Sequence, residues 1–182
     1  MDEETQRLAK ESDFWDYLAK NVPGHYQWGQ LIDLDTLLSH SINIDEPILL
    51  LPKSKKEQSL NAFKEILKFC GDIEADDAQK KEAIMRLYKI SLKKSKRLKD
   101  EIILLIIKQI RKNTTPSSVV RAWTLLANLL SVVKPSKGFT LPLLNWLMKV
   151  IDHSPEKGYQ DWAKYIVMRV YKMYKIKDER VF

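Results

Sequence analysis

Carboxylates are the first groups through which this sequence could perform chemistry. Asp100 and Glu101 stand side by side at the start of an apolar stretch. Neighbouring residues of a helix point about 100° apart, so the two cannot flank one substrate as an acid and a base. We expect instead that one of them pairs with Arg121 from the next helix. The two adjacent carboxylates therefore indicate a structural role and not a catalytic one.

Imidazole and thiol groups are few and scattered. His25, His40 and His153 lack the spacing of metal ligands, and Cys70 lies on an apolar helix face, where a free cysteine behaves as a small hydrophobic residue. No nucleophile, base and metal set converges at any spacing. The sequence predicts no metal, no cofactor and no enzymatic activity.

Lysine and arginine form a stronger pattern. From Arg86 to Lys112 the chain has ten lysine and arginine residues and two acidic residues. The charge of this segment, ten minus two or +8, exceeds the net charge of +7 of the whole chain. Such a segment fits the acidic tails of tubulin or another polyanion, although ordinary solvated helix ends would give the same pattern. The residues expected to bind a partner here are Lys93, Lys94, Lys96, Arg97, Lys99, Lys108, Arg111 and Lys112.

A second basic stretch falls on the last predicted helix. Helical spacing sets Lys164, Lys172 and Lys175 near one face, where they would extend the first patch. Alternatively, these lysines cover an apolar stripe with their aliphatic stems and stabilise the carboxyl end of the helix. Both interpretations stay open.

Composition narrows the class of protein. The 182 residues are 45% apolar, enough for the core of one domain, and a single cysteine excludes an internal disulfide framework. No secretory leader opens the chain, and the longest apolar run, Ile102 to Ile107, is too short to cross a bilayer. We expect a cytoplasmic location and an acidic partner, whether nucleic acid, anionic membrane or protein.

Apolar residues recur at helical spacing along most of the chain, and five glycines leave few of the turns that sheets require. The predicted fold class is all-α, a helical bundle or short α-α superhelix of about seven to nine helices. We expect one domain over 1–182, with a helical extension over 1–46. The predicted helices include residues 8–20, 98–111, 116–130, 139–151 and 155–175. Another is expected to begin after Lys53 and to carry apolar residues from Leu60 to Cys70. A further one, capped by the acidic stretch from Asp72 to Asp77, carries apolar residues from Ala83 to Leu92.

Turn residues set the expected boundaries. Gly71 follows its helix as a carboxyl-terminal cap, and Thr115 and Ser154 each precede a proline suited to the first turn of a helix. The run Ile48 to Leu51 lies between two prolines and predicts a buried, extended connector. Trp15, Trp123, Trp146 and Trp162 are expected in the core. For Trp28 and Tyr26, near Pro23-Gly24, exposure is the alternative, although core packing is favoured for the tryptophans.

In order and spacing, several segments resemble the signature of myosin tail homology 4 domains. They are Phe69-Cys70-Gly71-Asp72, Leu98-Lys99-Asp100-Glu101-Ile102, Lys108-Gln109, Asn113, Arg121-x-Trp123-x-Leu125-Leu126 and Pro135-Ser136. The resemblance covers residues 47–175. The chain departs from the family pattern at Cys70, Lys99, Leu105 and Val133, where methionine, arginine, glutamine and phenylalanine are usual.

The resemblance implies a non-catalytic module of unconventional myosin tails, plant kinesin-like proteins and some Rho GTPase-activating proteins. It implies a cytoskeletal location and binding to microtubules or to a cargo adaptor through basic surface. One alternative is a structural role, packing on an adjacent FERM or GTPase-activating domain. Another is a nucleic-acid-binding module, which is disfavoured because residues 93–99 hold no aromatic side chain for stacking on a base.

Overall fold

Helices account for all the regular secondary structure of the computed structural model, which describes residues 1–27 and 34–175. This confirms the all-α prediction, and no described helix is long and apolar enough to cross a membrane. The helices are α1 (Glu3–Glu11), α2 (Phe14–Asn21), α3 (Gly24–Gln27), α4 (Leu34–Leu37), α5 (Lys53–Cys70), α6 (Asp77–Ser91), α7 (Lys96–Ile110), α8 (Pro116–Leu129), α9 (Lys137–His153) and α10 (Lys157–Lys175).

Caps begin and end the longer helices. Asp76 and Gln79 form a reciprocal capping box at the start of α6, in which each side chain accepts from the backbone N–H of the other residue. Ser95 and Ser136 cap α7 and α9 with their hydroxyl groups. Gly71 ends α5 with a left-handed φ of 82°, a conformation that glycine adopts without a steric penalty. These residues therefore fix where the helices begin and, at Gly71, where one ends.

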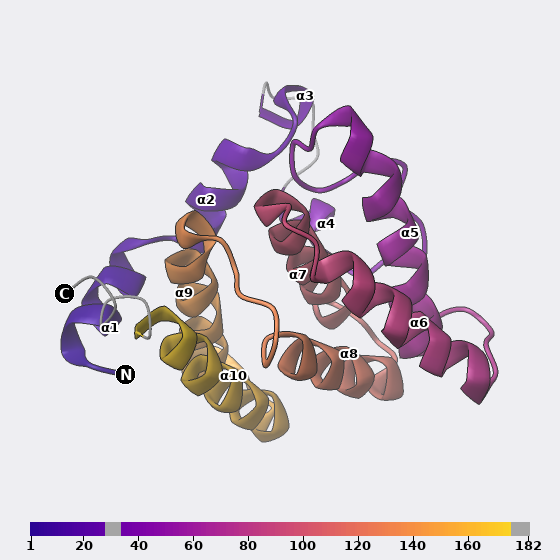
Figure 1. Ribbon diagram of the computed structural model, residues 1–182. Coiled ribbons are helices and arrows are strands. Elements are labelled where there is room, and N and C mark those ends of the chain that lie inside the picture. Colours follow the sequence, from indigo (N-terminus) through magenta and orange to yellow (C-terminus); the bar gives the residue numbers. More distant parts are fainter. Residues whose placement is uncertain (28–33, 176–182) are drawn as a thin grey trace.

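Helix α7 is the central element. Every residue from Asp100 to Ile110 is buried, including the six apolar residues 102–107, as the sequence predicted. The helix packs against α5 on one side and α8 on another. Figure 1 shows α5 and α6 paired on one side of α7, with α9 and α10 paired on the other. A helix that is apolar all round is stable only when enclosed in this way.

Helix α2 joins the core through an aromatic residue. Phe14 of α2 packs on Phe139 and Trp146 of α9, with ring centroids 6.4 and 6.1 Å apart. Trp146 stacks in turn on the fully buried Trp123 of α8, at 5.7 Å. The backbone N–H of Phe14 also donates to Asn145 Oδ1 at 3.2 Å. Residues of the predicted extension therefore contribute directly to the central packing.

Three predicted boundaries are wrong. The first helix is two helices, because Asp13 accepts from the N–H groups of Trp15 and Asp16 and starts α2 afresh. Helix α7 starts at Lys96, since Ser95 caps it, so Asp100 and Glu101 lie in its second turn and not its first. Ser154 ends α9 through its N–H to Val150 O and does not cap α10, which begins at Lys157.

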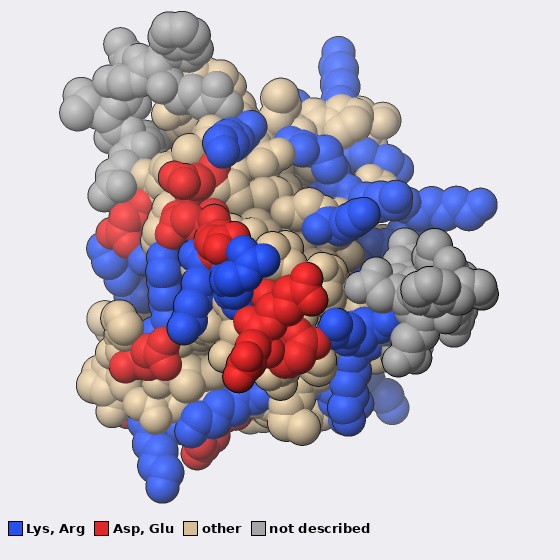
Figure 2. Space-filling view, turned by 90° about the vertical axis from the view of Figure 1, so that its left-hand side faces the viewer, with Lys and Arg blue, Asp and Glu red and all other residues tan. Residues whose placement is uncertain are grey.

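Charged side chains cover the face of the molecule that carries α1, α2 and α9 (Figure 2). Over the centre of this face, acidic and basic side chains lie next to one another. Toward the upper right of the same view, lysine and arginine side chains gather with no acidic atoms among them. The surface charge is therefore unevenly distributed on this face.

Candidate interaction surface

Glu101 is a fully buried carboxylate that holds the connector before α5. Its Oε1 accepts from Ile48 N at 2.9 Å and from Ser59 Oγ at 2.8 Å, and its Oε2 accepts from Leu49 N at 2.8 Å. Burial raises the pKa of this carboxyl to about 7. The connector is buried except for Leu50, which points outward. The predicted burial is confirmed for Ile48, Leu49 and Leu51, whereas the chain bends at residues 48 and 49, where an extended segment was predicted. The carboxylate binds the backbone of this connector.

Asp100 holds the start of α9. Its Oδ1 accepts from Ser136 N at 2.8 Å, and burial raises the pKa of its carboxyl above the usual range. Because they point in different directions from α7, the adjacent acids fix two different segments. Pro135, which precedes this contact, is buried with them.

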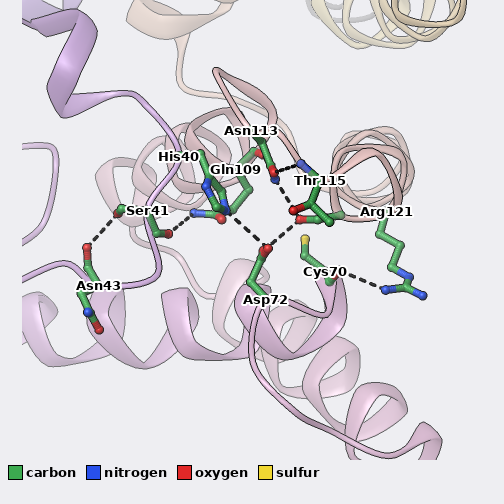
Figure 3. Close-up of polar contacts among 10 residues, drawn as sticks. His40, Ser41, Asn43, Cys70, Asp72, Gln109, Asn113, Thr115 and Arg121 are labelled. Carbon is green, nitrogen blue, oxygen red and sulfur yellow. Dashed lines mark hydrogen bonds and ion pairs between the residues drawn. The ribbon is translucent and has the colours of Figure 1, made fainter.

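Arg121 does not pair with either acid, so that prediction is wrong. Its Nη1 donates to Cys70 O at 3.1 Å, at the carboxyl end of α5, because α8 turns this side chain toward α5 and not α7 (Figure 3). Gly71 makes room for the guanidinium, since a Cβ atom there would lie 2.5 Å from Nη1. The glycine and arginine of the signature therefore form one helix cap.

Asp72 joins three loops in a polar network (Figure 3). Its Oδ1 lies 3.3 Å from His40 Nε2, and its Oδ2 accepts from Ser118 Oγ at 2.9 Å. Asn113 extends the network, donating to Ser118 Oγ and accepting from Thr115 N. This network explains why polar residues occur at the signature positions 72 and 113.

Cys70 is buried, as are Trp123 and Trp146, whereas Trp15 and Trp162 are half-buried and His153 is exposed. Burial raises the pKa of the Cys70 thiol to about 12, and His25 lies 2.6 Å from Glu46. Among the described residues, no three His, Cys, Asp or Glu side chains lie together as metal ligands would. Tyr26 is half-buried, while Trp28 lies outside the described residues.

Three of the predicted partner-binding cations have partners within the protein, although Arg111 is only half-buried and Lys112 is exposed. Lys108 is buried, and its Nζ donates to Leu37 O at 2.8 Å and Ser39 O at 2.6 Å. Burial lowers the pKa of this amine to about 8. Arg111 and Lys112 both pair with Asp35, and Arg111 also covers the ring of Trp15 at 4.6 Å. We therefore exclude these three from the candidate surface.

The cations before and at the start of α7 are arranged differently. Lys93, Lys94 and Lys96 are exposed, and Lys99 is half-exposed. Arg97 Nη1 donates to Asn21 Oδ1 at 2.8 Å and its Nε to Leu50 O at 3.1 Å, which ties α7 to the end of α2 and to the connector before α5. The first turns of α5 and α7 therefore lie at the same end of the molecule.

We call this region the basic pole. It consists of Lys93, Lys94, Lys96, Arg97 and Lys99 together with Lys53, Lys55 and Lys56. Within residues 1–27 and 34–175, none of these cations takes part in a salt bridge. Sequence reasoning missed the three lysines of α5, because they lie far along the chain from the others.

Helix dipoles add to the positive charge of the pole. The first turns of α5 and α7 contain no acidic residue and carry lysines or arginine instead. The amino end of a helix bears about half a positive charge, so cations there are unfavourable and anions are favoured. For α5 the absence of first-turn acids was readable in the sequence, whereas for α7 the predicted start at Leu98 placed Asp100 and Glu101 in the first turn and concealed it.

The lysines of α10 only partly follow the prediction. Lys164 lies 3.9 Å from Asp161 in the middle of the helix, and Lys175 lies 2.9 Å from Asp2. Lys172 is exposed in the last turn. Lys134 donates to Met173 O and so ties this turn to the loop before α9, whose Ser136 binds Asp100 of α7. The end of α10 therefore lies nearer the pole than Lys164 does.

The described residues thus form an all-α domain with exposed cations at one end. The MyTH4 domain family matches residues 85–181, which is more than half of the chain, and the chain belongs to this family. MyTH4 is a non-catalytic module. No curated protein matches the chain.

Solved structures share the fold. The MyTH4-FERM MF2 domain of Dictyostelium discoideum myosin VII is similar at a TM-score of 0.76 and 17% identity, covering 87% of this chain and 34% of that one. The MF1 domain of the same myosin is similar at a TM-score of 0.74 and 18% identity, covering 96% and 35%. This chain thus spans about a third of the length of those structures, which combine a MyTH4 with a FERM domain.

Proposed function

We propose that this MyTH4 domain binds microtubules through its basic pole, which takes up the acidic tails of tubulin. One observation carries the proposal: exposed cations gather at the amino ends of α5 and α7 without a salt-bridge partner among the described residues. Both the charges and the helix dipoles there attract an anionic chain.

The arrangement suits a flexible acidic polymer better than one small anion. The side chains of Lys93, Lys94 and Lys96 are separately exposed and do not converge on a buried cavity. Each contact of this kind contributes about 0.2–1 kcal/mol and is weakened by salt. Affinity therefore depends on several contacts acting together, as expected for a tail with many carboxylates.

The test is co-sedimentation with microtubules over a salt series, comparing the wild type with the triple variant Lys93→Glu, Lys94→Glu, Lys96→Glu. Arg97 is left unchanged, because its bonds to Asn21 and Leu50 support the fold. We expect wild-type binding to fall as salt rises, and the variant to bind at least about tenfold more weakly at low salt.

A matched control separates the pole from net charge. Lys64, Lys81 and Lys157 are exposed on α5, α6 and α10, outside the pole and without salt bridges to described residues. Changing them to glutamate alters the net charge by the same amount and should leave most of the binding. If both variants lose binding equally, a defined pole is wrong. If the folded wild type stays in the supernatant at low salt, a cargo protein or a neighbouring domain replaces tubulin as the candidate partner.

A further inference from the structure

Ser95 stands in the middle of the basic pole. Lys93 and Lys94 precede it, and Lys96 and Arg97 follow it. Its side chain caps α7, but the hydrogen bond from Leu98 N to its Oγ is long, at 3.4 Å. The residue is partly exposed, so its hydroxyl is both accessible and weakly held.

The backbone around Ser95 is open. Residues 93–95 lie outside the helices, and Ser95 itself is extended, with φ −70° and ψ 104°. Few bonds hold this turn: Lys93 N donates to Ile90 O at 3.3 Å, and Lys99 N to Ser95 O at 3.2 Å. Kinases select substrates partly through patterns of complementary charge. Here two cations of the turn precede the Ser95 hydroxyl and two cations in the first turn of α7 follow it.

We propose that Ser95 is a phosphorylation site for a serine/threonine kinase that selects lysine- and arginine-flanked serines, and that its phosphate switches off the basic pole. The inference rests on the proposed function for its consequence in binding. Ser95 Oγ attacks the γ-phosphorus of ATP, the bond to the β–γ bridging oxygen breaks, ADP leaves, and the hydroxyl proton passes to the catalytic base of the kinase.

The phosphate has opposite effects on binding and on folding. It adds a charge of about −1.5 to −2 among the cations of the pole, which weakens the attraction for an acidic partner. It also places an anion at the amino end of α7, whose first turn contains no acidic residue. Phosphorylation should therefore weaken binding while leaving the thermal midpoint unchanged or higher.

Two neighbouring serines lack this combination. Ser54 is exposed, but only one cation precedes it and its backbone is already helical in the first turn of α5. The backbone of Ser136 binds Asp100, so a phosphate there would lie close to a buried carboxylate and be repelled. Ser54 is consequently the matched control for Ser95.

The experiment treats the full chain with protein kinase C and Mg²⁺-ATP and locates the phosphate by mass spectrometry. Wild type and Ser54→Ala should gain a phosphate at Ser95, and Ser95→Ala should lose most of the incorporation. The phosphorylated chain should elute from heparin-agarose at lower salt than the untreated chain and melt at the same or a higher temperature. Heparin is a polyanion, so this readout does not depend on tubulin.

Two results would overturn the inference. In one, a peptide of residues 89–101 is phosphorylated while the folded chain is not, which would show that the turn is closed to kinases. In the other, Ser95 is phosphorylated but elution from heparin is unchanged or the melting temperature falls. Normal phosphorylation and heparin shifts without any microtubule binding would support the Ser95 site and contradict only the choice of tubulin as partner.

Discussion

At the scale of single residues, Glu101 shows how the chain uses a buried charge. Three donors reach its carboxylate, and each would be left buried and unsatisfied without it. No cation contacts it directly among the described residues, so burial dominates its pKa. The Glu101 carboxylate is therefore held by hydrogen bonds alone, and the stability of the fold depends on its protonation state.

The raised pKa of Glu101 predicts a dependence of stability on pH. Its folded pKa, about 7, lies above the ordinary value of 4.5, so the folded state binds this proton more tightly than the unfolded state does. The contribution of this tighter proton binding to the free energy of unfolding is fully present below about pH 4.5. It is lost as the pH rises through 7, which lowers the free energy of unfolding by at most about 3 kcal/mol. Urea unfolding of wild type and Glu101→Gln between pH 5 and pH 8 measures it.

The variant provides the reference, because glutamine does not titrate. As the pH rises, the free energy of unfolding of the wild type should fall relative to that of Glu101→Gln. Parallel pH profiles for the two proteins would show that the carboxyl titrates outside this window.

Sequence reasoning at this scale was partly right. The angle between adjacent helix residues excluded an acid–base pair of Asp100 and Glu101, and the structure shows them bound to different segments. The partners themselves could not be predicted, because backbone N–H groups carry no sequence signature. Arg121 was assigned to the wrong helix for the same reason: its partner is a carbonyl at the end of α5.

At the scale of elements, caps decide where helices stop. The periodicity over residues 8–20 is continuous, yet Asp13 divides it into α1 and α2 because its carboxylate satisfies the first N–H groups of a new helix. Gly71 was predicted as a cap from its position, and the structure confirms it. The additional role of Gly71 in making room for Arg121 required knowledge of tertiary contacts.

Gly71→Ala should lower the free energy of unfolding by about 1–3 kcal/mol. Alanine is strained at φ 82°, and its Cβ would displace the Arg121 guanidinium from Cys70 O. Gly138→Ala is the control, because nothing lies within 4 Å of the added atom in α9. Urea denaturation should show the control neutral or more stable.

A double variant tests the mechanism. When Arg121→Ala is already present, Gly71→Ala should lower the free energy of unfolding by less than it does in the wild type, because the contact that it would displace no longer exists. Additive costs would mean that backbone strain alone explains the glycine.

At the scale of the whole molecule, charge is concentrated where it disfavours folding. The cations at the amino ends of α5 and α7 repel one another and oppose both helix dipoles. Their grouping depends on hydrogen bonds that Arg97 donates and that Asp100 and Glu101 accept, all between segments distant in sequence. This explains why the basic run at 93–99 was predicted as a patch while the lysines of α5 were not.

This concentration predicts that salt stabilises the fold. Raising the salt concentration screens the repulsion, so the thermal midpoint of the wild type should rise by about 2–4 °C. The triple variant at Lys93, Lys94 and Lys96 should melt higher than the wild type at low salt and respond less to added salt. A variant less stable than the wild type at low salt would contradict this account. Calorimetry at several salt concentrations provides the measurement.

The contact between Gly71 and Arg121 also makes the two positions depend on each other. A larger residue at 71 would have to displace the guanidinium, and a shorter residue at 121 would leave Cys70 O without its donor. A substitution at one position therefore changes the surroundings of the other, although fifty residues separate them in the chain and neither belongs to the basic pole.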